Sequence, residues 1–286
     1  KVNRLINQGR KLGMVRIDIE SPFQRLVELE QRLMDIARLI SAVVTPTVPG
    51  SAESTLQQVG RAAANQLLET LRDGDIIAIT GGKAVSAIVD NLQPERAFDV
   101  VVVPLTGGVQ GKCYTDVNDL ATQLVDRLGG KTMLVHAPLF AESREQRDML
   151  MDMASVREVF ELARQATVAL VGIGSIRTPG SSYYDLHPIS AADRDVLFSQ
   201  GVSGEMMAHL IHADGSVADF ELNSRLVALA PTELMRCQRV IGVAAGTEKV
   251  LPIQAALNGR LLKSLIVDEV TAAAVLSAME SKQNVA

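Results

Sequence analysis

The stretch DIIAIT at residues 75–80, followed by GGK at residues 81–83, decides the fold of this 286-residue chain. The first part is a short apolar run bounded by polar and turn-forming residues, which is typical of a buried strand. The glycines indicate a tight turn, and Val85, Ile88 and Val89 then recur on one face of a predicted helix. The pattern therefore predicts a unit of strand, glycine turn and helix.

The same alternation of short apolar runs and helical stretches continues along the chain. Further strand candidates are residues 100–103, 132–135, 168–173, 240–243 and 265–267. Because these runs alternate with helices, they predict an α/β fold with a mostly parallel sheet covered on both faces. Such sheets bind ligands at the carboxyl ends of their strands, so we expect the site in the loops that begin at Thr80, Pro104, Pro138, Gly172 and Ala244 and just after Val267.

Composition favours the same class and limits the compartment. Hydrophobic residues make up 47% of the chain and aromatic residues only 3%, as expected where buried strands alternate with Ala-rich helices. The two cysteines, Cys113 and Cys237, are too few for a disulfide framework or a thiolate metal site. No apolar run approaches the roughly 20 residues that a bilayer requires, and no signal-peptide pattern is present. We therefore expect a cytoplasmic protein.

One segment, residues 202–227, interrupts the alternation of strands and helices. Residues 207–212, a turn at Asp214-Gly215 and residues 217–220 predict an inserted antiparallel β-hairpin. His209 and His212 on this hairpin point to opposite faces of a strand, which argues against a shared metal ion. The chain offers no ordered set of Ser, His and Asp either, so we expect no metal, no cofactor and no nucleophilic catalysis.

The first twenty residues differ in charge from the rest of the chain. A net charge of −5 argues against nucleic acid as the partner of the bulk of the protein, yet five basic residues precede the first acid, Asp18. Residues 1–11 are predicted to be helical, Gly13 to end the helix, and residues 15–19 to form a short strand, the order in which a winged helix-turn-helix ends. The basic residues belong either to a solvated helix face or to the end of a DNA-binding unit.

Residues 21–50 are predicted to be a linker and boundary. A helix opens at Ser21-Pro22 and carries an apolar stripe made of Phe23, Leu26, Leu29, Leu33 and Ile36. The stripe suits a dimer seam and packing within the same subunit equally well. Two prolines then end a strand-like run at residues 43–50, so we expect a DNA-binding remnant at residues 1–20 and the main domain at residues 51–286.

Two glycine turns that carry lysines are the leading candidates for a binding site. Gly81, Gly82 and Lys83 lie between a strand and a helix, where backbone N–H groups, the helix N-terminus and the amine all favour an anion. Gly246 and Lys249 repeat this arrangement at another helix start. The glycine spacing excludes a Walker loop and a dinucleotide fingerprint. The turns are either ordinary tight turns or the two sides of a clamp for an anionic or polyhydroxylated ligand.

Two carboxylates are candidates for hydrogen bonds to ligand hydroxyls or for general bases. Asp268 follows the last predicted strand, where capping of the next helix is the favoured interpretation. Glu205 follows Gly204 in an irregular stretch, where a ligand contact and ordinary solvation are equally supported.

In their order along the chain, these motifs resemble the SorC-type transcriptional regulators. KVNRL at residues 1–5 and GMVRI at residues 13–17 resemble the end of a recognition helix and its wing. The later stretches that resemble the effector domain are VGIGS (171–175), LNSRL (222–226), GTEK (246–249), QAAL (254–257) and VDEVTA (267–272). The resemblance covers essentially the whole chain, and its specificity lies in the ordered set.

The resemblance implies a fold, a function and an assembly. The effector domain of such regulators is similar to the glucosamine-phosphate deaminase, ribose-phosphate isomerase and CoA-transferase-like folds, which implies a Rossmann-like sheet acting as a sensor. It implies a sugar, sugar phosphate or sugar alcohol as the effector, which alters oligomer packing and operator DNA binding. A homodimer or homotetramer without a membrane partner is also implied.

Carried over by position, the resemblance assigns ligand contacts to Gly81, Gly82, Lys83, Ala84, Thr106, Gly107, Gly108, Asn118, Gly172, Glu205, Lys249 and Asp268. It assigns DNA contacts to Lys1, Asn3 and Arg4. Ala84 stands where family turns often carry Thr, and Thr106 where some sugar-phosphate-binding members carry Arg. A neutral sugar alcohol or a singly charged ligand therefore fits as well as a bisphosphate. Because the chain begins inside the expected recognition helix, we expect it to bind DNA poorly by itself.

Two other interpretations stay open at the level of sequence. A sugar-phosphate isomerase or deaminase would use Glu205 or Asp268 as its base, and related folds host both sensors and enzymes. The basic N-terminus favours the regulator, because such an enzyme does not need it. A pure dimerisation module is disfavoured by the paired glycine-lysine turns.

Overall fold

The computed structural model describes residues 22–110, 116–177, 181, 183 and 191–283. Its strands are β1 (Ser41–Thr45), β2 (Ile76–Ile79), β3 (Val101–Pro104), β4 (Lys131–Thr132), β5 (Val168–Gly174), β6 (Val202–Met206), β7 (His209–His212), β8 (Arg239–Ala244) and β9 (Ser264–Asp268). Its helices are α2 (Pro22–Ala37), α3 (Ala52–Thr70), α4 (Lys83–Asn91), α5 (Val117–Leu128), α6 (Arg144–Asp152), α7 (Ala154–Ala163), α9 (Ala191–Ser199), α10 (Glu221–Ser224), α11 (Val250–Asn258), α12 (Glu269–Gln283) and the 3-10 helices η1 (Pro231–Arg236) and η2 (Thr247–Lys249).

The main sheet is parallel throughout. Its strands lie in the order β1-β9-β8-β5-β2-β3-β4, and each neighbouring pair runs in the same direction. β6 and β7 form an antiparallel hairpin that continues from the end of β5. The predicted α/β class, with a mostly parallel sheet and a small inserted hairpin, is confirmed.

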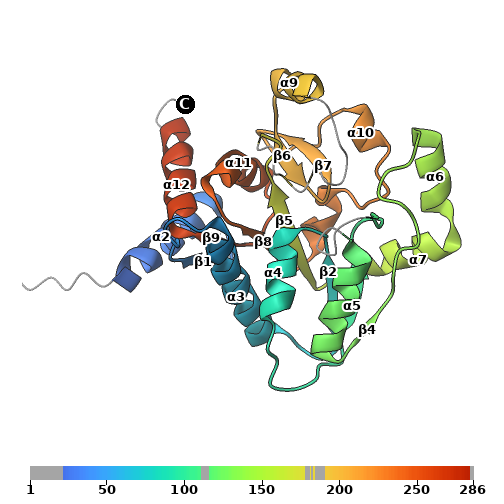
Figure 1. Cartoon of the computed structure of the whole chain (residues 1–286), viewed down its shortest axis with the longest axis horizontal. Helices are drawn as coiled ribbons and strands as arrows, with labels where there is room; N and C mark the ends of the chain where they lie inside the picture. Colours follow the sequence, from blue (N-terminus) through green and yellow to red (C-terminus); the bar gives the residue numbers. More distant parts are fainter. Residues whose placement is uncertain (1–21, 111–115, 178–180, 182, 184–190, 284–286) are drawn as a thin grey trace, which may run out of the picture.

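Helices cover both faces of the sheet because successive strand side chains alternate between them. Ile77 and Ile79 of β2 pack in one core with α3, α4 and α5. Ala78, between them, belongs to a second core on the other face, where α2, α7, α11 and α12 pack. Figure 1 shows α3, α4 and α5 side by side in front of the sheet. The strands are therefore buried on both faces, as their continuous apolar runs predict.

The segment before residue 50 packs against the main sheet. Leu26, Leu29 and Leu33 of α2 are buried, so packing within the subunit accounts for much of the apolar stripe. β1 is an edge strand paired with β9, and the Glu30 carboxylate accepts a hydrogen bond from the backbone N–H of Val44 at 2.8 Å. In the described part of residues 21–50, α2 and β1 thus pack against the same sheet as the rest of the chain, and the domain bounds stay a prediction.

Two local predictions were incomplete. β6 and β7 form a hairpin that turns at Met207 and Ala208. The predicted turn at Asp214-Gly215 is present as well, since the Gly215 N–H donates to the His212 carbonyl and Ile211 bridges Val217 in antiparallel pairing. Neither Met207 nor Ala208 is a glycine, so the pattern of turn residues did not reveal their positive φ angles of 54° and 61°. The strand predicted at residues 132–135 ends at Thr132, because the Asn118 side chain, instead of a neighbouring strand, bonds the backbone of Val135.

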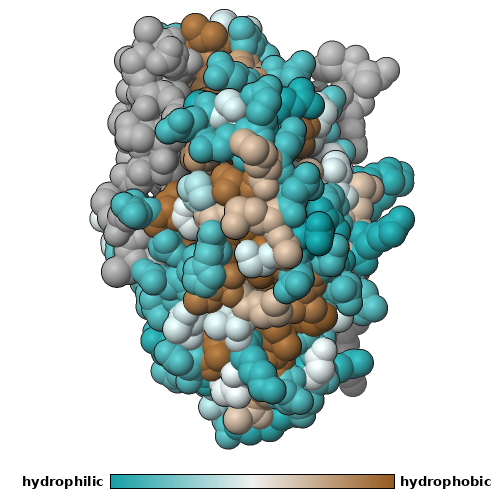
Figure 2. Space-filling model, turned by 90° about the vertical axis from the view of Figure 1, so that its right-hand side faces the viewer, coloured by the Kyte–Doolittle hydropathy of each residue, from teal (hydrophilic) through white to brown (hydrophobic). Residues whose placement is uncertain are grey.

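Apolar side chains also reach the surface. The side of the molecule drawn in Figure 2 shows hydrophobic residues gathered among polar ones. On α6 and directly after it, Met149 is 66% and Met153 is 47% exposed. Among the described residues, no helix has both the length and the apolar character needed to cross a membrane.

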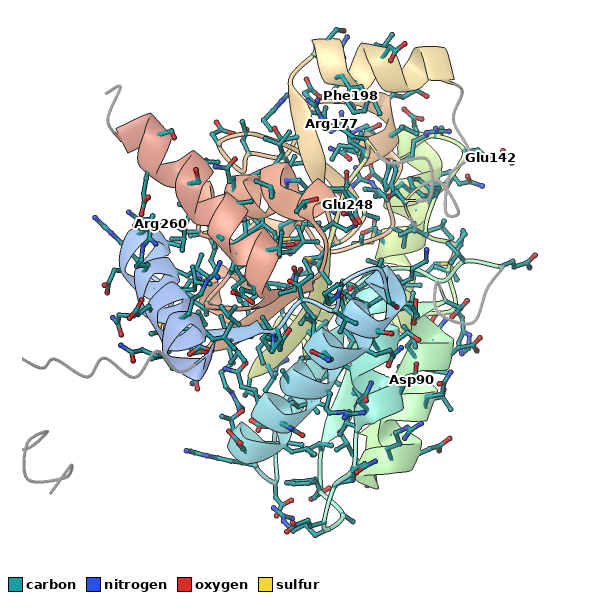
Figure 3. All side chains as sticks on the ribbon, turned by 60° about the vertical axis from the view of Figure 1, so that its left-hand side comes forward. Asp90, Glu142, Arg177, Phe198, Glu248 and Arg260 are labelled. Atoms are coloured by element: carbon teal, nitrogen blue, oxygen red, sulfur yellow. The ribbon has the colours of Figure 1, made fainter. Side chains whose placement is uncertain are left out.

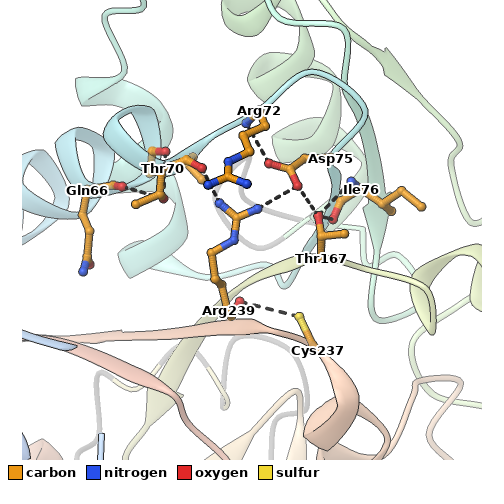
Figure 4. Close-up of polar contacts among 9 residues, drawn as sticks. Gln66, Thr70, Arg72, Asp75, Ile76, Thr167, Cys237 and Arg239 are labelled. Atoms are coloured by element: carbon orange, nitrogen blue, oxygen red, sulfur yellow. Dashed lines mark hydrogen bonds and ion pairs between the residues drawn. The ribbon is translucent and has the colours of Figure 1, made fainter. Parts of the chain in front are cut away.

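A buried charge network joins the amino ends of β2 and β8 (Figure 4). Arg239 forms a 2.7 Å ion pair with Asp75, which also accepts a 2.6 Å hydrogen bond from the Thr167 hydroxyl. A second Arg239 nitrogen donates to the backbone oxygen of Thr70 at 2.6 Å. Burial opposes ionisation of Asp75, but the hydrogen bonds from Thr167 and Arg239 outweigh it and hold the pKa of this carboxyl below its usual value.

We expect Asp75→Ala to lower the free energy of unfolding by about 3 kcal/mol, because it leaves the Arg239 guanidinium partly buried without its partner. Because the folded-state pKa is depressed, this contribution should be present near neutral pH and lost as the pH falls through that pKa. Urea unfolding at pH 7 checks the first point. The control is Asp73→Ala, which breaks an exposed ion pair with Arg96 and should leave the midpoint nearly unchanged. Equal effects of the two substitutions would contradict the assignment.

Candidate functional site

A cavity of about 240 Å³ opens where the carboxyl ends of β2, β5 and β8 meet. The predicted ligand contacts that line it are Gly81, Gly82, Lys83, Ala84, Thr106, Gly107, Gly172, Glu205 and Lys249. Gly172 lies near the end of β5, Glu205 belongs to the hairpin that extends from β5, and the others follow a strand of the sheet. Of the loops predicted from the strand pattern, all except the one just after Val267 therefore contribute to one cavity.

Two helices begin at this cavity without a side-chain cap. α4 begins after Gly82, whose φ of 120° suits glycine, and α11 begins after Lys249; neither N-cap side chain bonds the helix. By contrast, α3 and α5 begin with capping bonds from Ser51 and Asp116. The first N–H groups of α4 and α11 have no side-chain cap as acceptor, and the positive ends of both helix dipoles lie at the cavity.

Lys83 and Lys249 lie at the same cavity although they are distant in sequence. Burial lowers the pKa of Lys249, and the positive charge of Lys83 acts in the same direction, while Glu205 and Glu248 oppose the shift. Glu248 lies near the middle of the molecule in Figure 3, beside the start of α11. The cavity therefore brings these two amines together with the carboxylates of Glu205 and Glu248.

Glu205 is a carboxylate that lines the cavity. Burial raises its pKa to about 7, against the attraction of Lys249 and a 3.1 Å hydrogen bond from the backbone N–H of Ala208. Its carboxyl group occupies the space that a side chain at Gly174 would fill, so a larger residue there would displace the carboxyl group. Near neutral pH this group is able either to donate or to accept a hydrogen bond.

Several lining residues escaped the sequence analysis. Met207 and Ala208 lie in left-handed backbone conformations at the hairpin turn, and both line the cavity. Such strain in residues other than glycine is concentrated at functional sites. Glu248 also lines the cavity and lies two residues after Gly246 in the second glycine turn. Glu248 could have been predicted, because the sequence analysis had already named the turn at residues 246–249 as a candidate site. No pattern in the sequence indicated the turn at residues 207–208.

Three of the predicted ligand contacts do not line the cavity. The Asn118 amide bonds the N–H and the carbonyl oxygen of Val135, both at 3.0 Å. Gly108 lies against the Asn118 amide. Asp268 is 1% exposed, and its carboxylate is hydrogen-bonded to Thr47, Gly246 and Thr271. These side chains bind the backbone or their neighbours, which leaves none of them directed into the cavity.

The remaining predictions concern DNA and metals. Lys1, Asn3 and Arg4, the predicted DNA contacts, lie outside the described residues. Within the described ranges, no three His, Cys, Asp or Glu side chains gather to hold a metal ion. His209 is buried, and burial lowers its pKa to about 4, so it is neutral at physiological pH.

Comparison with known proteins places the chain in a family. Residues 21–277 match the family model Sugar-bind, described as "Putative sugar-binding domain". The chain belongs to the SorC-type family of sugar-binding transcriptional regulators. It is 31% identical to the transcriptional regulator LsrR of Enterobacter sp. (strain 638), over 97% of this chain and 84% of that protein. It is 28% identical to the erythritol catabolism regulatory protein EryD of Brucella abortus (strain 2308), over 99% of this chain and 89% of that protein.

A solved structure agrees with the assignment. The full-length sorbitol operon regulator SorC of Klebsiella pneumoniae matches with a TM-score of 0.83 and 28% identity, covering 96% of this chain and 88% of that one. The expectation drawn from the resemblance, a sugar-responsive transcriptional regulator on an α/β fold, is confirmed for this SorC-type chain. The relatives named here are all regulators.

The buried carboxyl of this SorC-type regulator should make its stability fall with rising pH. The pKa of Glu205 is raised from 4.5 to about 7 in the folded state, so the folded protein binds a proton more tightly than the unfolded chain across that interval. The free energy of unfolding should therefore decrease as the pH rises from 4.5 to about 7 and then level off.

Glu205→Gln should remove this decline, which unfolding midpoints measured across the same pH interval would detect. The matched control is Glu221→Gln, because the Glu221 side chain is 84% exposed. A wild-type profile parallel to that of Glu205→Gln would show that the carboxyl group titrates normally.

Proposed function

We propose that the cavity binds the effector, a sugar, sugar phosphate or sugar alcohol, and that the chain does no chemistry on it. The observation that carries this proposal is the convergence of Lys83, Lys249 and Glu205 on one cavity. Two cations with a carboxyl of raised pKa suit a ligand that has an anionic or electronegative end and several hydroxyl groups. The names of two relatives, which refer to erythritol and sorbitol, support the polyol class.

Each part of the lining has a role in this proposal. The uncapped N-termini of α4 and α11, with their lysines, hold the anionic or oxygen-rich end. Glu205 exchanges hydrogen bonds with hydroxyl groups, and its Ala208 contact keeps the carboxyl oriented. Leu56 and Ile173 provide apolar contact for the carbon skeleton. This mixture of an apolar wall and a few convergent polar groups is typical of small-molecule sites.

The effector regulates by its unequal affinity for two states of the protein. A ligand that binds one arrangement of subunits or loops more tightly shifts the population towards it, and operator affinity changes by linkage. Assembly as a homodimer or homotetramer and contact with operator DNA belong to this proposal. The cytoplasm is the compartment in which such a regulator meets both its effector and DNA.

Removing a cavity lysine should weaken effector binding strongly. We expect Lys249→Ala and Lys83→Ala each to lower affinity by about 10- to 100-fold, because each loses a charge-assisted hydrogen bond in a poorly solvated site. Isothermal titration calorimetry with sorbitol, erythritol and their monophosphates measures this change. Lys131→Ala, at the exposed start of β4, is the control and should bind as the wild type does. Unchanged affinity in both cavity variants, with the fold intact by circular dichroism, would refute the assignment.

The enzyme alternative is tested by the fate of a bound compound. A base such as Glu205 in an isomerase would exchange a proton on the carbon skeleton or move a carbonyl group. We expect sugar phosphates incubated with the protein in deuterated water to keep their proton and carbon NMR spectra unchanged. Deuterium incorporation that is absent from Glu205→Gln samples would instead establish catalysis.

A further inference from the structure

The Asp268 carboxylate joins three separate segments of the chain behind the cavity. One oxygen accepts hydrogen bonds from the backbone N–H of Gly246 at 2.8 Å and from the Thr271 hydroxyl at 2.7 Å. The other accepts from the Thr47 hydroxyl at 2.8 Å and from the Thr271 N–H at 3.2 Å. Burial opposes ionisation, but these hydrogen bonds keep the pKa of Asp268 below its usual value. The group is therefore a buried anion with all of its bonds inside the protein.

These three segments differ in what they carry. Gly246 begins the turn that ends in Lys249, the cavity lysine. Thr271 lies in the first turn of α12, and Thr47 follows β1 and accepts a 3.1 Å hydrogen bond from the N–H of Val270. Asp268 thus lies between the cavity turn and the start of α12.

α12 is in turn tied to α2. Arg25 forms a 3.0 Å ion pair with Glu269 at the start of α12, and Arg32 pairs with Glu280 further along the helix. The two helices contact each other, and we call them the α2–α12 pair. α2 follows directly after residues 1–21, which include the predicted DNA-binding end of the chain.

We propose that Asp268 is a positioning residue that couples the turn at residues 246–249 to the α2–α12 pair. The coupling rests on the proposed binding of the effector at Lys249. A carboxylate whose oxygens are both fully engaged is unable to follow a displaced Gly246 N–H without loosening its bonds to Thr47 and Thr271. Because the site is buried, each broken bond costs more than it would in water. Movement of the cavity turn is thereby transmitted to the helix that leads to the N-terminal segment.

The first test displaces the turn without any ligand. Gly246→Ala places a side chain at a φ of 102° and against the Glu248 carboxylate, so the turn must move. Hydrogen exchange measured by mass spectrometry should then rise about ten-fold in peptides from the α2–α12 pair, while peptides from β2 and β3 stay within about two-fold. The matched control is Gly129→Ala, which strains another glycine of positive φ at the end of α5. No change in the α2–α12 pair, or an equal change in both variants, would overturn the proposal.

The second test uses D-glucitol 6-phosphate as the probe. In the wild type, saturating probe should change the exchange of the α2–α12 pair. In Thr47→Val the probe should bind with affinity within about two-fold of the wild type, while the change in exchange at α2 falls at least about five-fold, because Thr47 lies outside the cavity but inside the network. An undiminished response in Thr47→Val contradicts the coupling. Absence of probe binding to the wild type counts against the proposed effector class, and the ligand-free test then decides the coupling.

Discussion

The parallel register of β2, β5 and β8 is the constraint on which the site depends. Ile79 of β2 pairs with Leu170 of β5, and Gly172 of β5 pairs with Val243 of β8. The loops that follow these three strands therefore begin on the same side of the sheet. The loop after β2 carries Lys83, and the loop after β8 carries Lys249. A slip of one residue would also turn every strand side chain to the opposite face, which two separate cores forbid. The packing of the sheet therefore fixes the separation of the cavity lysines.

Buried charged groups have different environments at the amino ends and at the carboxyl ends of the strands. At the amino edge, Asp75 and Arg239 form a close ion pair with additional hydrogen bonds, and the pKa of the acid is held low. At the carboxyl edge, Glu205 and Lys249 influence each other's pKa, yet burial dominates and shifts both towards their neutral forms. Buried charged groups that lack strong partners within the protein are stabilised most by contact with a bound polar ligand. The charges at the amino ends of the strands therefore contribute to stability, and those at the carboxyl ends belong to the proposed binding site.

The sequence was sufficient for the class of fold and for most of the cavity, because those features follow from local patterns. Apolar runs such as residues 75–80 locate strands, and glycine turns such as residues 81–82 and 246 locate the loops between strand and helix. The parallel topology then brings the loops together. What the patterns missed depends on long-range pairing: the hairpin turn at Met207 and Ala208 carries no turn-forming residue, and Asn118 ends a strand by bonding a distant backbone group.

The family resemblance assigned Asp268 as a ligand contact, but the residue lies behind the cavity. A comparison of the N-termini of α4 and α12 explains why. Both helices follow a buried parallel strand, so both present N–H groups at the same edge of the sheet. Before α4 the chain has Gly82, which provides no acceptor and leaves the helix N-terminus facing the cavity. Before α12 it has Asp268, whose own carboxylate accepts from the first turn, at Thr271. The anion at α12 is thus part of the protein, whereas at α4 no N-cap side chain provides one, and this is where we propose that the effector binds. In a sheet of this kind, a glycine at the end of a strand leaves a helix N-terminus available to a ligand, and an aspartate there closes it.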